Sequence, residues 1–324
     1  MLEKLLEFIK RHDFFILTTH DPADADGLGA QLALACILRD KEKRCRIINA
    51  SPIPEHFKFM DPQGLIEYWD KDKHGALPEQ SALFIVDTAD EYNIGQMRDV
   101  FLSVREVFVI DHHEPKSHAA LPGINDASAA STCEITAGLA EDAGVTLDPD
   151  AAFAAYTGIA YDTGFFAYPK TGPRTLRAAM TLLTLGANSN DTYRHLCENV
   201  PTRRLLLQRK AIASMSLYCK NKVAAQILRS EDFSETGALP EDTDGLVNFP
   251  LKAYEIVISF LIKETPDKKV RCSLRSKGSI NVAKIAQRFD GGGHLNAAGF
   301  KSKTDINNTL AQTLAHITEL LEKQ

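Results

Sequence analysis

The chain has 324 residues, of which 44% are hydrophobic and 25% charged, a balance typical of globular proteins. Its length suggests two domains, because a single core rarely grows beyond about 250–300 residues. The net charge of −6 argues against a protein that coats long nucleic acids, which need a basic surface. The sequence has no apolar run of membrane-spanning length and no signal-peptide pattern at its start. The six cysteines form no Cys-x-x-Cys pair and predict buried thiols. We therefore expect a cytoplasmic protein.

Apolar runs alternate with helical patterns over the first half of the chain. The predicted strands are 14–19, 46–49, 83–88 and 106–110, and the predicted helices are 2–11, 27–39, 131–144 and 150–161. Ser131 and Glu134 form the pattern of a capping box at the start of the third helix. Strands that alternate with helices imply a parallel sheet with helices on both faces.

The pattern changes near Gly186, where a charged helical segment follows. A second pattern begins at 222, with predicted strands at 222–228, 255–262 and 269–274 and predicted helices at 281–289 and 305–322. The sequence thus predicts an α/β protein with an N-terminal parallel-sheet domain (1–187), a helical linker (188–220) and a smaller α/β domain (221–324).

Acidic residues and histidines follow four of the apolar segments in the first half. They are His20, Asp24 and Asp26 after the first strand, Asp87 after 83–86, Asp111, His112 and His113 after 107–110, and Asp162 after 158–161. We interpret all four positions as strand ends, where ligand sites of parallel sheets lie. Crowded carboxylates repel one another, and a cation relieves that cost. Any one of these residues alone is typical of a cap or turn, but their recurrence favours a metal site. An oxygen-rich set without cysteine suits manganese or magnesium better than zinc.

The Asp-His-His triplet after a β-run, preceded by His-x3-Asp-x-Asp, resembles the DHH phosphoesterase family, and Asp87 and Asp162 match two further motifs of that family. The resemblance implies one Mn²⁺ on His20, Asp24 and Asp87 and a second on Asp26, Asp87, His112 and Asp162, with Mg²⁺ as the alternative ion. It also implies that His113 faces the phosphate and that Asp111 orients the site. The first motif usually reads close to Pro-Asp-Gly-Asp-Ala. Here Ala23–Gly27 keeps the ligand spacing but displaces the proline and glycine, which leaves the loop conformation open.

A second constellation lies in residues 270–300, where three glycines precede His294 and Arg275 ends a predicted strand. Glycines let a ligand approach the backbone amides closely, and arginine can bind phosphate with two hydrogen bonds. A tight turn beside a surface histidine would explain the same pattern. The segment also resembles the DHH-associated C-terminal domain, which in its family binds the nucleotide and closes over the metal site. The resemblance implies substrate contacts from Arg275, Ser276, Gly292, Gly293 and His294.

Together these resemblances cover nearly the whole chain, and its layout is similar to that of the nanoRNase/pAp phosphatases. They imply hydrolysis of oligoribonucleotides of two to about five residues, of adenosine 3′,5′-bisphosphate, or of both, by a water that two metals activate. A phosphodiesterase for cyclic di-AMP or pApA would use the same metal site. An inorganic pyrophosphatase and an inactive nucleotide sensor are further alternatives. We expect neither long duplex nucleic acid nor a membrane as a partner. The sequence leaves open whether the protein forms a homodimer.

Overall fold

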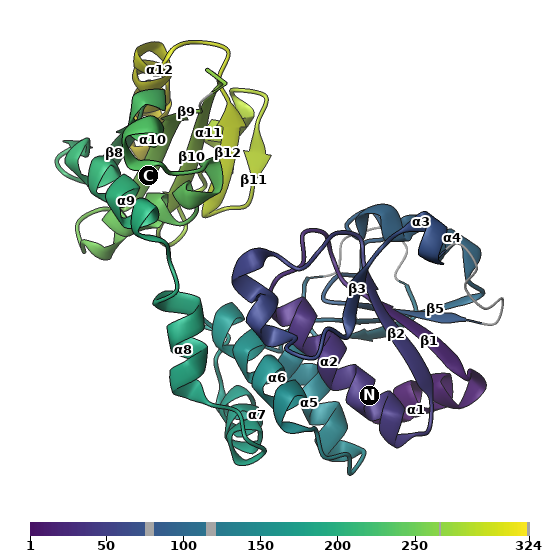
Figure 1. The fold of residues 1–324 in the computed structure, drawn as a ribbon. Coiled ribbons are helices and arrows are strands. Elements are labelled where there is room, and N and C mark those ends of the chain that lie inside the picture. Colours follow the sequence, from purple (N-terminus) through teal and green to yellow (C-terminus); the bar gives the residue numbers. More distant parts are fainter. Residues whose placement is uncertain (75–80, 115–120, 266, 323–324) are drawn as a thin grey trace. The chain divides into compact units, whose positions relative to one another are not determined.

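The computed structural model describes residues 1–74, 81–114, 121–265 and 267–322. The chain divides into two compact units, Met1–Asn199 and Val200–Gln324 (Figure 1). Helix α8 (Ser189–Cys197) belongs to the first unit and helix α9 (Thr202–Ala213) to the second. The domain borders that we expect at 187 and 221 remain a prediction.

The first unit contains a six-stranded parallel sheet, which confirms the predicted fold class. Its strand order is β3 (Ile66–Tyr68), β2 (Arg44–Asn49), β1 (Phe14–Thr18), β4 (Ala82–Val86), β5 (Glu106–Asp111) and β6 (Gly123–Asn125). The chain builds outward from β1 in one direction, returns to β4, and then builds in the other direction. The strand order therefore reverses between β1 and β4, which is where open α/β sheets bind ligands.

Helices cover both faces of this sheet. One face packs against α1 (Leu2–Arg11), α2 (Ala25–Asp40), α5 (Thr132–Asp142) and α6 (Pro149–Asp162), and the other against η2 (Gly95–Met97) and α4 (Arg98–Ser103). The first unit also contains η1 (Glu55–Met60), α3 (Lys71–His74) and α7 (Pro173–Thr184).

Two glycines let α2 and α6 pack closely. A Cβ at Gly29 would lie 2.5 Å from the carbonyl oxygen of Ala154, and one at Gly158 would lie 2.9 Å from that of Ala25. Glycine therefore permits the two helix backbones to touch, and this contact brings the start of α2 near the end of α6.

The structure corrects two details of the prediction. Residues 158–161 do not end a strand, because they form the last turns of α6; Asp148 caps that helix by accepting a hydrogen bond from the Ala151 amide at 2.9 Å. The capping box at α5 is only half formed. Ser131 accepts the Glu134 amide at 3.0 Å, but the Glu134 carboxylate is 3.3 Å from the Ala130 amide instead of binding the Ser131 amide.

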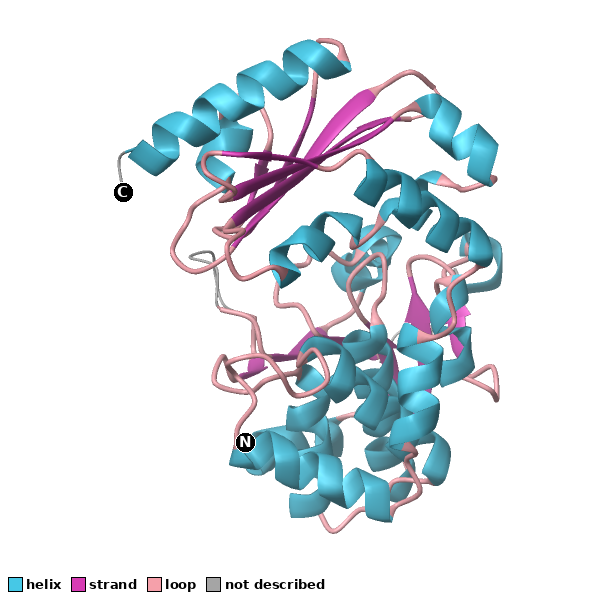
Figure 2. Cartoon of the chain, turned by 90° about the vertical axis from the view of Figure 1, so that its left-hand side faces the viewer, coloured by secondary structure: helices cyan, strands magenta, loops and turns pink. Residues whose placement is uncertain are grey.

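The second unit is a smaller α/β unit, as predicted, and the structure shows that its sheet is mixed. Its strand order is β11 (Gly292–Gly293), β12 (Ala297–Lys301), β10 (Val270–Ser276), β9 (Ile258–Glu264), β8 (Val223–Leu228) and β7 (Ser216–Tyr218). Only β8 and β9 pair in parallel. Helices α11 (Ala283–Gln287) and α12 (Ile306–Glu322) cover one face, and Figure 2 shows α12 running along the sheet to the C-terminus. The other face packs against α9, α10 (Ser230–Thr236) and η4 (Leu246–Lys252), with η3 (Pro240–Thr243) beside α9.

The six cysteines are free, but only Cys36, Cys133 and Cys272 are buried, while Cys197 is exposed. The prediction of buried thiols therefore holds for half of them. Within the described ranges, no helix combines the length and apolar character that crossing a membrane requires.

Candidate metal centre

The switch point between β1 and β4 gathers the predicted metal ligands. His20 follows β1, Asp87 follows β4 and His112 follows β5. Helices supply the remaining three: Asp24 is the N-cap of α2, Asp26 lies in the first turn of α2, and Asp162 ends α6. All six residues thus lie at the ends of strands or helices that meet at one edge of the sheet.

The first group of side chains contains His20, Asp24 and Asp87, whose nearest ligand atoms all lie within 4.8 Å of one another. The Nε2 atom of His20 is 3.5 Å from Asp24 Oδ1 and 3.4 Å from Asp87 Oδ2. Asp24 Oδ1 also accepts the backbone amides of Asp26 and Gly27 at 3.0 and 3.1 Å. The cap of α2 therefore fixes the direction of this carboxylate.

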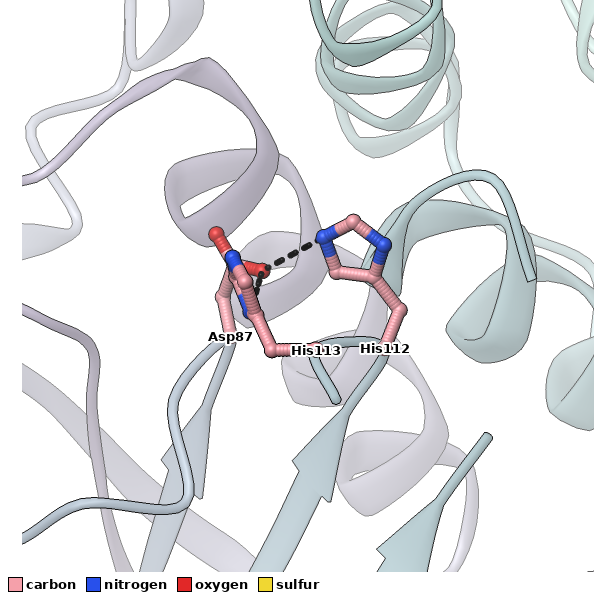
Figure 3. Close-up of side chains that lie close together, drawn as sticks. All are labelled: Asp87, His112 and His113. Carbon is pink, nitrogen blue, oxygen red and sulfur yellow. Dashed lines mark ion pairs between the residues drawn. The ribbon is translucent and has the colours of Figure 1, made fainter. Parts of the chain in front are cut away.

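The second group contains Asp26, His112 and Asp162, again within 4.8 Å of one another. The Nε2 atom of His112 is 3.1 Å from Asp162 Oδ2 and 3.8 Å from Asp26 Oδ2. It is also 3.5 Å from Asp87 Oδ1. Figure 3 marks this contact between His112 and Asp87 with a dashed line. Asp87 therefore turns one oxygen toward His20 and the other toward His112, so its carboxylate joins the two groups.

The electrostatics of this cluster favour a bound cation. Burial raises the pKa of Asp26, and the neighbouring carboxylates of Asp87 and Asp162 raise it further. Burial likewise raises the pKa of Asp87, against a hydrogen bond from His20 that lowers it. Burial lowers the pKa of His20, but its contacts with Asp24 and Asp87 outweigh that effect and raise it to about 10. The buried carboxylates thus draw a positive charge to themselves, which a divalent cation would supply more strongly.

His112 gives a separate test of whether a metal fits. Both ring nitrogens are buried, and neither makes a hydrogen bond within the part of the chain that the structure describes. Buried polar atoms are nearly always paired in native proteins. An imidazole nitrogen without a hydrogen bond that faces three carboxylates is typical of a metal site. The residues present therefore fit a divalent cation.

Asp111 and His113 form a pair beside the cluster. His113 Nδ1 lies 2.7 Å from Asp111 Oδ1, and the His113 amide donates to the same oxygen at 3.1 Å. Burial raises the pKa of Asp111, but the hydrogen bond with His113 outweighs it and lowers the pKa, while the same bond raises the pKa of His113. Asp111 therefore orients the His113 ring, whose side chain remains 58% exposed.

Sequence reasoning missed one part of this centre, the first turn of α5. The amides of Thr132 and Cys133 donate to the Asp26 carboxylate at 2.6 and 2.8 Å, and the Thr132 hydroxyl donates to Asp87 at 2.8 Å. The Ser131 capping signal predicts where this helix begins. It carries no information on which carboxylates the free amides of the helix meet, because those lie about a hundred residues earlier in the chain.

The predicted substrate residues of the second unit lie at one edge of its sheet, on β10 and β11 and in the turn after β11. Arg275 on β10 pairs with Ala297 on β12, and β11 pairs with β12 on its other side. Arg275 is half-buried, and its Nη1 atom donates to the Leu274 carbonyl at 2.9 Å. Burial lowers the pKa of its guanidinium, an effect that Asp244 partly counters. It makes no ion pair with a carboxylate of the described residues, so its charge remains available.

The glycine segment forms a tight hairpin in which the His294 amide donates to Ala297 at 2.7 Å. Gly293 has φ 140, and a Cβ there would lie 2.4 Å from the Ala297 carbonyl oxygen, so glycine is required. Beyond the adjacent residues, no atom of the described ranges lies within 4 Å of the corresponding point at Gly292, and His294 is exposed. The hairpin therefore leaves open space on the Cβ side of Gly292.

Ser276 lies under this hairpin and is buried. Its hydroxyl donates to the Ile280 carbonyl at 2.6 Å and accepts from Asn296 Nδ2 at 2.9 Å. Both bonds join β10 to the loops around it. The predicted substrate contact from Ser276 stays a prediction, and the bonds give this residue a structural role in addition.

Comparison with known proteins finds relatives along the whole chain. Residues 15–159 match the DHH family, N-terminal domain, and residues 220–323 match the DHHA1 domain. A probable bifunctional oligoribonuclease and PAP phosphatase from Streptococcus mutans is 29% identical, over 94% of each chain. A cyclic-di-AMP phosphodiesterase from Listeria monocytogenes is 27% identical over 93% of this chain but only 46% of its own length.

Among solved structures, an exopolyphosphatase-related protein from Bacteroides fragilis superposes with a TM-score of 0.88. It is 25% identical, and the match covers 99% of this chain and 95% of that one. Residues 15–159 are therefore a DHH family N-terminal domain, and residues 220–323 are a DHHA1 domain.

Proposed function

We propose that this protein is a manganese-dependent phosphoesterase that hydrolyses short oligoribonucleotides and adenosine 3′,5′-bisphosphate. The observation that carries the proposal is the position of Asp87, whose two oxygens face the histidines of two separate ligand groups. A single carboxylate shared between two groups of ligands suits a pair of divalent cations. Two such cations activate a water for attack and neutralise phosphoryl oxygens.

The protein's own residues would bind and orient the substrate at this centre. His113 is held by Asp111, is largely exposed, and has a raised pKa, so it donates a hydrogen bond to a phosphate oxygen. Asp24 and Asp26 are fixed by helix starts and need no rearrangement when the cations bind. The choice of manganese over magnesium rests on the two imidazoles in an otherwise oxygen-rich set.

The substrate class rests on the second unit and on the relatives. Arg275 makes no ion pair with a carboxylate in the described ranges, and the Cβ side of Gly292 is open. These groups suit an anionic, nucleotide-sized ligand. Arginine can donate two parallel hydrogen bonds to a phosphate, and exposed backbone amides can donate hydrogen bonds to anions. The Streptococcus mutans relative, which matches over nearly its whole length, is named for oligoribonucleotides and PAP. We extend both substrates to this chain.

A substrate panel tests the proposal. Purified protein loaded with Mn²⁺ is given adenosine 3′,5′-bisphosphate, RNA of two, five and twenty residues, pApA, cyclic di-AMP and pyrophosphate, and kcat/KM is measured for each. We expect the di- and pentanucleotides and adenosine 3′,5′-bisphosphate to exceed the twentymer at least tenfold, about 1.4 kcal/mol of transition-state stabilisation. Equal or higher kcat/KM on the twentymer would reject the short-substrate proposal.

The second candidate is a phosphodiesterase for cyclic di-AMP or pApA, which the Listeria monocytogenes relative favours by its name. The same panel separates the two, since a kcat/KM highest on cyclic di-AMP or pApA would favour that candidate. Pyrophosphate as the best substrate would favour a pyrophosphatase. Binding of these nucleotides without any turnover would favour an inactive sensor.

A further inference from the structure

The first turn of α5 contacts two of the six predicted metal ligands at once. Both oxygens of Asp26 accept backbone amides, Oδ2 from Thr132 at 2.6 Å and Oδ1 from Cys133 at 2.8 Å. Ser131 takes the Glu134 amide, which leaves the first two amides of the helix for Asp26. These two bonds fix the direction of both Asp26 oxygens, and the Asp26 side chain is fully buried.

The side chain of the same threonine reaches the second ligand. The Thr132 hydroxyl donates to Asp87 Oδ1 at 2.8 Å, and Thr132 is fully buried. Oδ1 is the oxygen that faces His112, whereas Oδ2 faces His20. Asp87 also has φ 64, a left-handed conformation that a non-glycine residue keeps only where its surroundings hold it. The hydroxyl therefore fixes the rotation of the carboxylate, with Oδ2 directed toward His20.

We infer that Thr132 is a positioning residue of the metal centre. Its amide holds Asp26 and its hydroxyl orients Asp87, so one residue sets the spacing between ligands of the two proposed cation positions. The inference rests on the proposed function, because it concerns the same centre. Groups that orient metal ligands typically contribute 10- to 100-fold in metal affinity. Valine has the shape of threonine but has no proton to donate, so it removes this bond while it preserves the helix start.

The test is a calorimetric titration of the metal-free full-length protein with Mn²⁺ alone. Thr132→Val is compared with Thr136→Val, which makes the same change one turn further along α5. Thr136 is equally buried, and its hydroxyl donates only to the carbonyls of Thr132 and Cys133. We expect Thr132→Val to weaken Mn²⁺ binding at least tenfold, within the usual range for such groups. Thr136→Val should stay within about twofold of the wild type, since its bond is local to the helix.

A second pair of variants isolates the hydroxyl if Thr132→Val folds poorly. Thr132→Ser keeps the donor and Thr132→Ala removes it, and thermal unfolding of the metal-free proteins reports the structural cost of each. We expect serine to bind Mn²⁺ within about threefold of the wild type and alanine at least tenfold more weakly. Equal affinity of the serine and alanine variants, or of the two valine variants, would overturn the role of Thr132. A wild-type protein that binds no Mn²⁺ would instead refute the proposed function.

Discussion

The two candidate regions of this protein differ in how much of their chemistry the fold already holds in place. In the candidate metal centre, Asp26 and Asp87 are buried and bonded to the first turn of α5, and burial together with neighbouring side chains shifts their pKa values. In the second unit, Gly292 and His294 are exposed. The difference teaches that the first region holds its charged side chains in place before a ligand binds. The second region instead presents exposed groups that a ligand can contact.

This comparison predicts different kinetic signatures. Groups that act on the reacting phosphate change kcat when they are removed, whereas groups that bind the rest of the substrate change mainly KM. The predictions below test that division, beginning with the largest expected effect.

Metal removal should abolish activity altogether. Protein stripped with a chelator and then dialysed should hydrolyse dinucleotides at less than about a thousandth of its rate, because metal activation supplies several kcal/mol of the barrier. Mn²⁺ should restore the rate more fully than Mg²⁺. Mn²⁺ should also raise the melting temperature, since it binds only the folded state. Full activity in chelator would contradict the two-metal proposal and with it the contrast between the regions.

Substitution of the shared ligand should have the next largest effect. Asp87→Asn keeps the size of the side chain but removes its charge, and we expect kcat to fall at least a hundredfold, about 2.7 kcal/mol. The metal-free variant should be no less stable than the wild type, because burial disfavours this charge. Unfolding curves and steady-state kinetics on a dinucleotide measure the two effects.

The control for Asp87 is Asp148→Ala in the same unit. Asp148 caps α6 and touches none of the predicted ligands. Its loss should lower the free energy of unfolding by about 1 kcal/mol, as for other N-caps, and leave kcat unchanged. If Asp87→Asn retains more than about a tenth of the wild-type kcat, Asp87 does not bridge two cations.

The contrast between the regions also explains what the sequence could predict. The parallel sheet was predictable because each buried strand is an apolar run with β-branched residues, as in Leu83–Val86. The gathering of the predicted ligands His20, Asp87 and His112 beyond the strand ends followed from the sheet type. The position of Asp162 was predicted for the wrong reason, because it ends a helix whose residues are buried nearly all round, and such a helix resembles a strand over short windows.

Other parts had no local signal. Strands β7, β11 and β12 are two to five residues long. All three contain exposed residues, and β11 and β12 also contain glycine, so their sequences give only a weak strand signal. The bonds from α5 to Asp26 and Asp87 join residues 106 and 45 positions apart, respectively. Only the packed structure brings these atoms together.

Substitution of Arg275 should have a smaller effect than substitution of Asp87, and the effect should fall mainly on KM. We expect Arg275→Ala to raise KM for dinucleotides about tenfold, the usual cost of one charge-assisted hydrogen bond, with kcat falling less than threefold. Arg271→Ala is the matched control, since Arg271 lies on the same strand β10 and is exposed. An aryl phosphoester without a nucleoside should respond little to either change. An unchanged KM in Arg275→Ala would remove this residue from the substrate site.

Substitution of Gly292 should give the smallest effect, a rise in KM without a loss of stability. No atom lies within 4 Å of the position that a Cβ would take there, so Gly292→Ala should leave the melting temperature of the free protein unchanged. The added methyl group should still raise KM about threefold to tenfold, because a ligand that contacts the backbone amides needs that space. Gly293→Ala is the contrasting change: its Cβ would clash with Ala297, so it should lower stability. Thermal unfolding and KM measured on both variants separate a cost to the ligand from a cost to the fold. If Gly292→Ala changes neither, the glycine segment is only a hairpin, and the substrate contacts of the second unit must be sought elsewhere than in its open backbone.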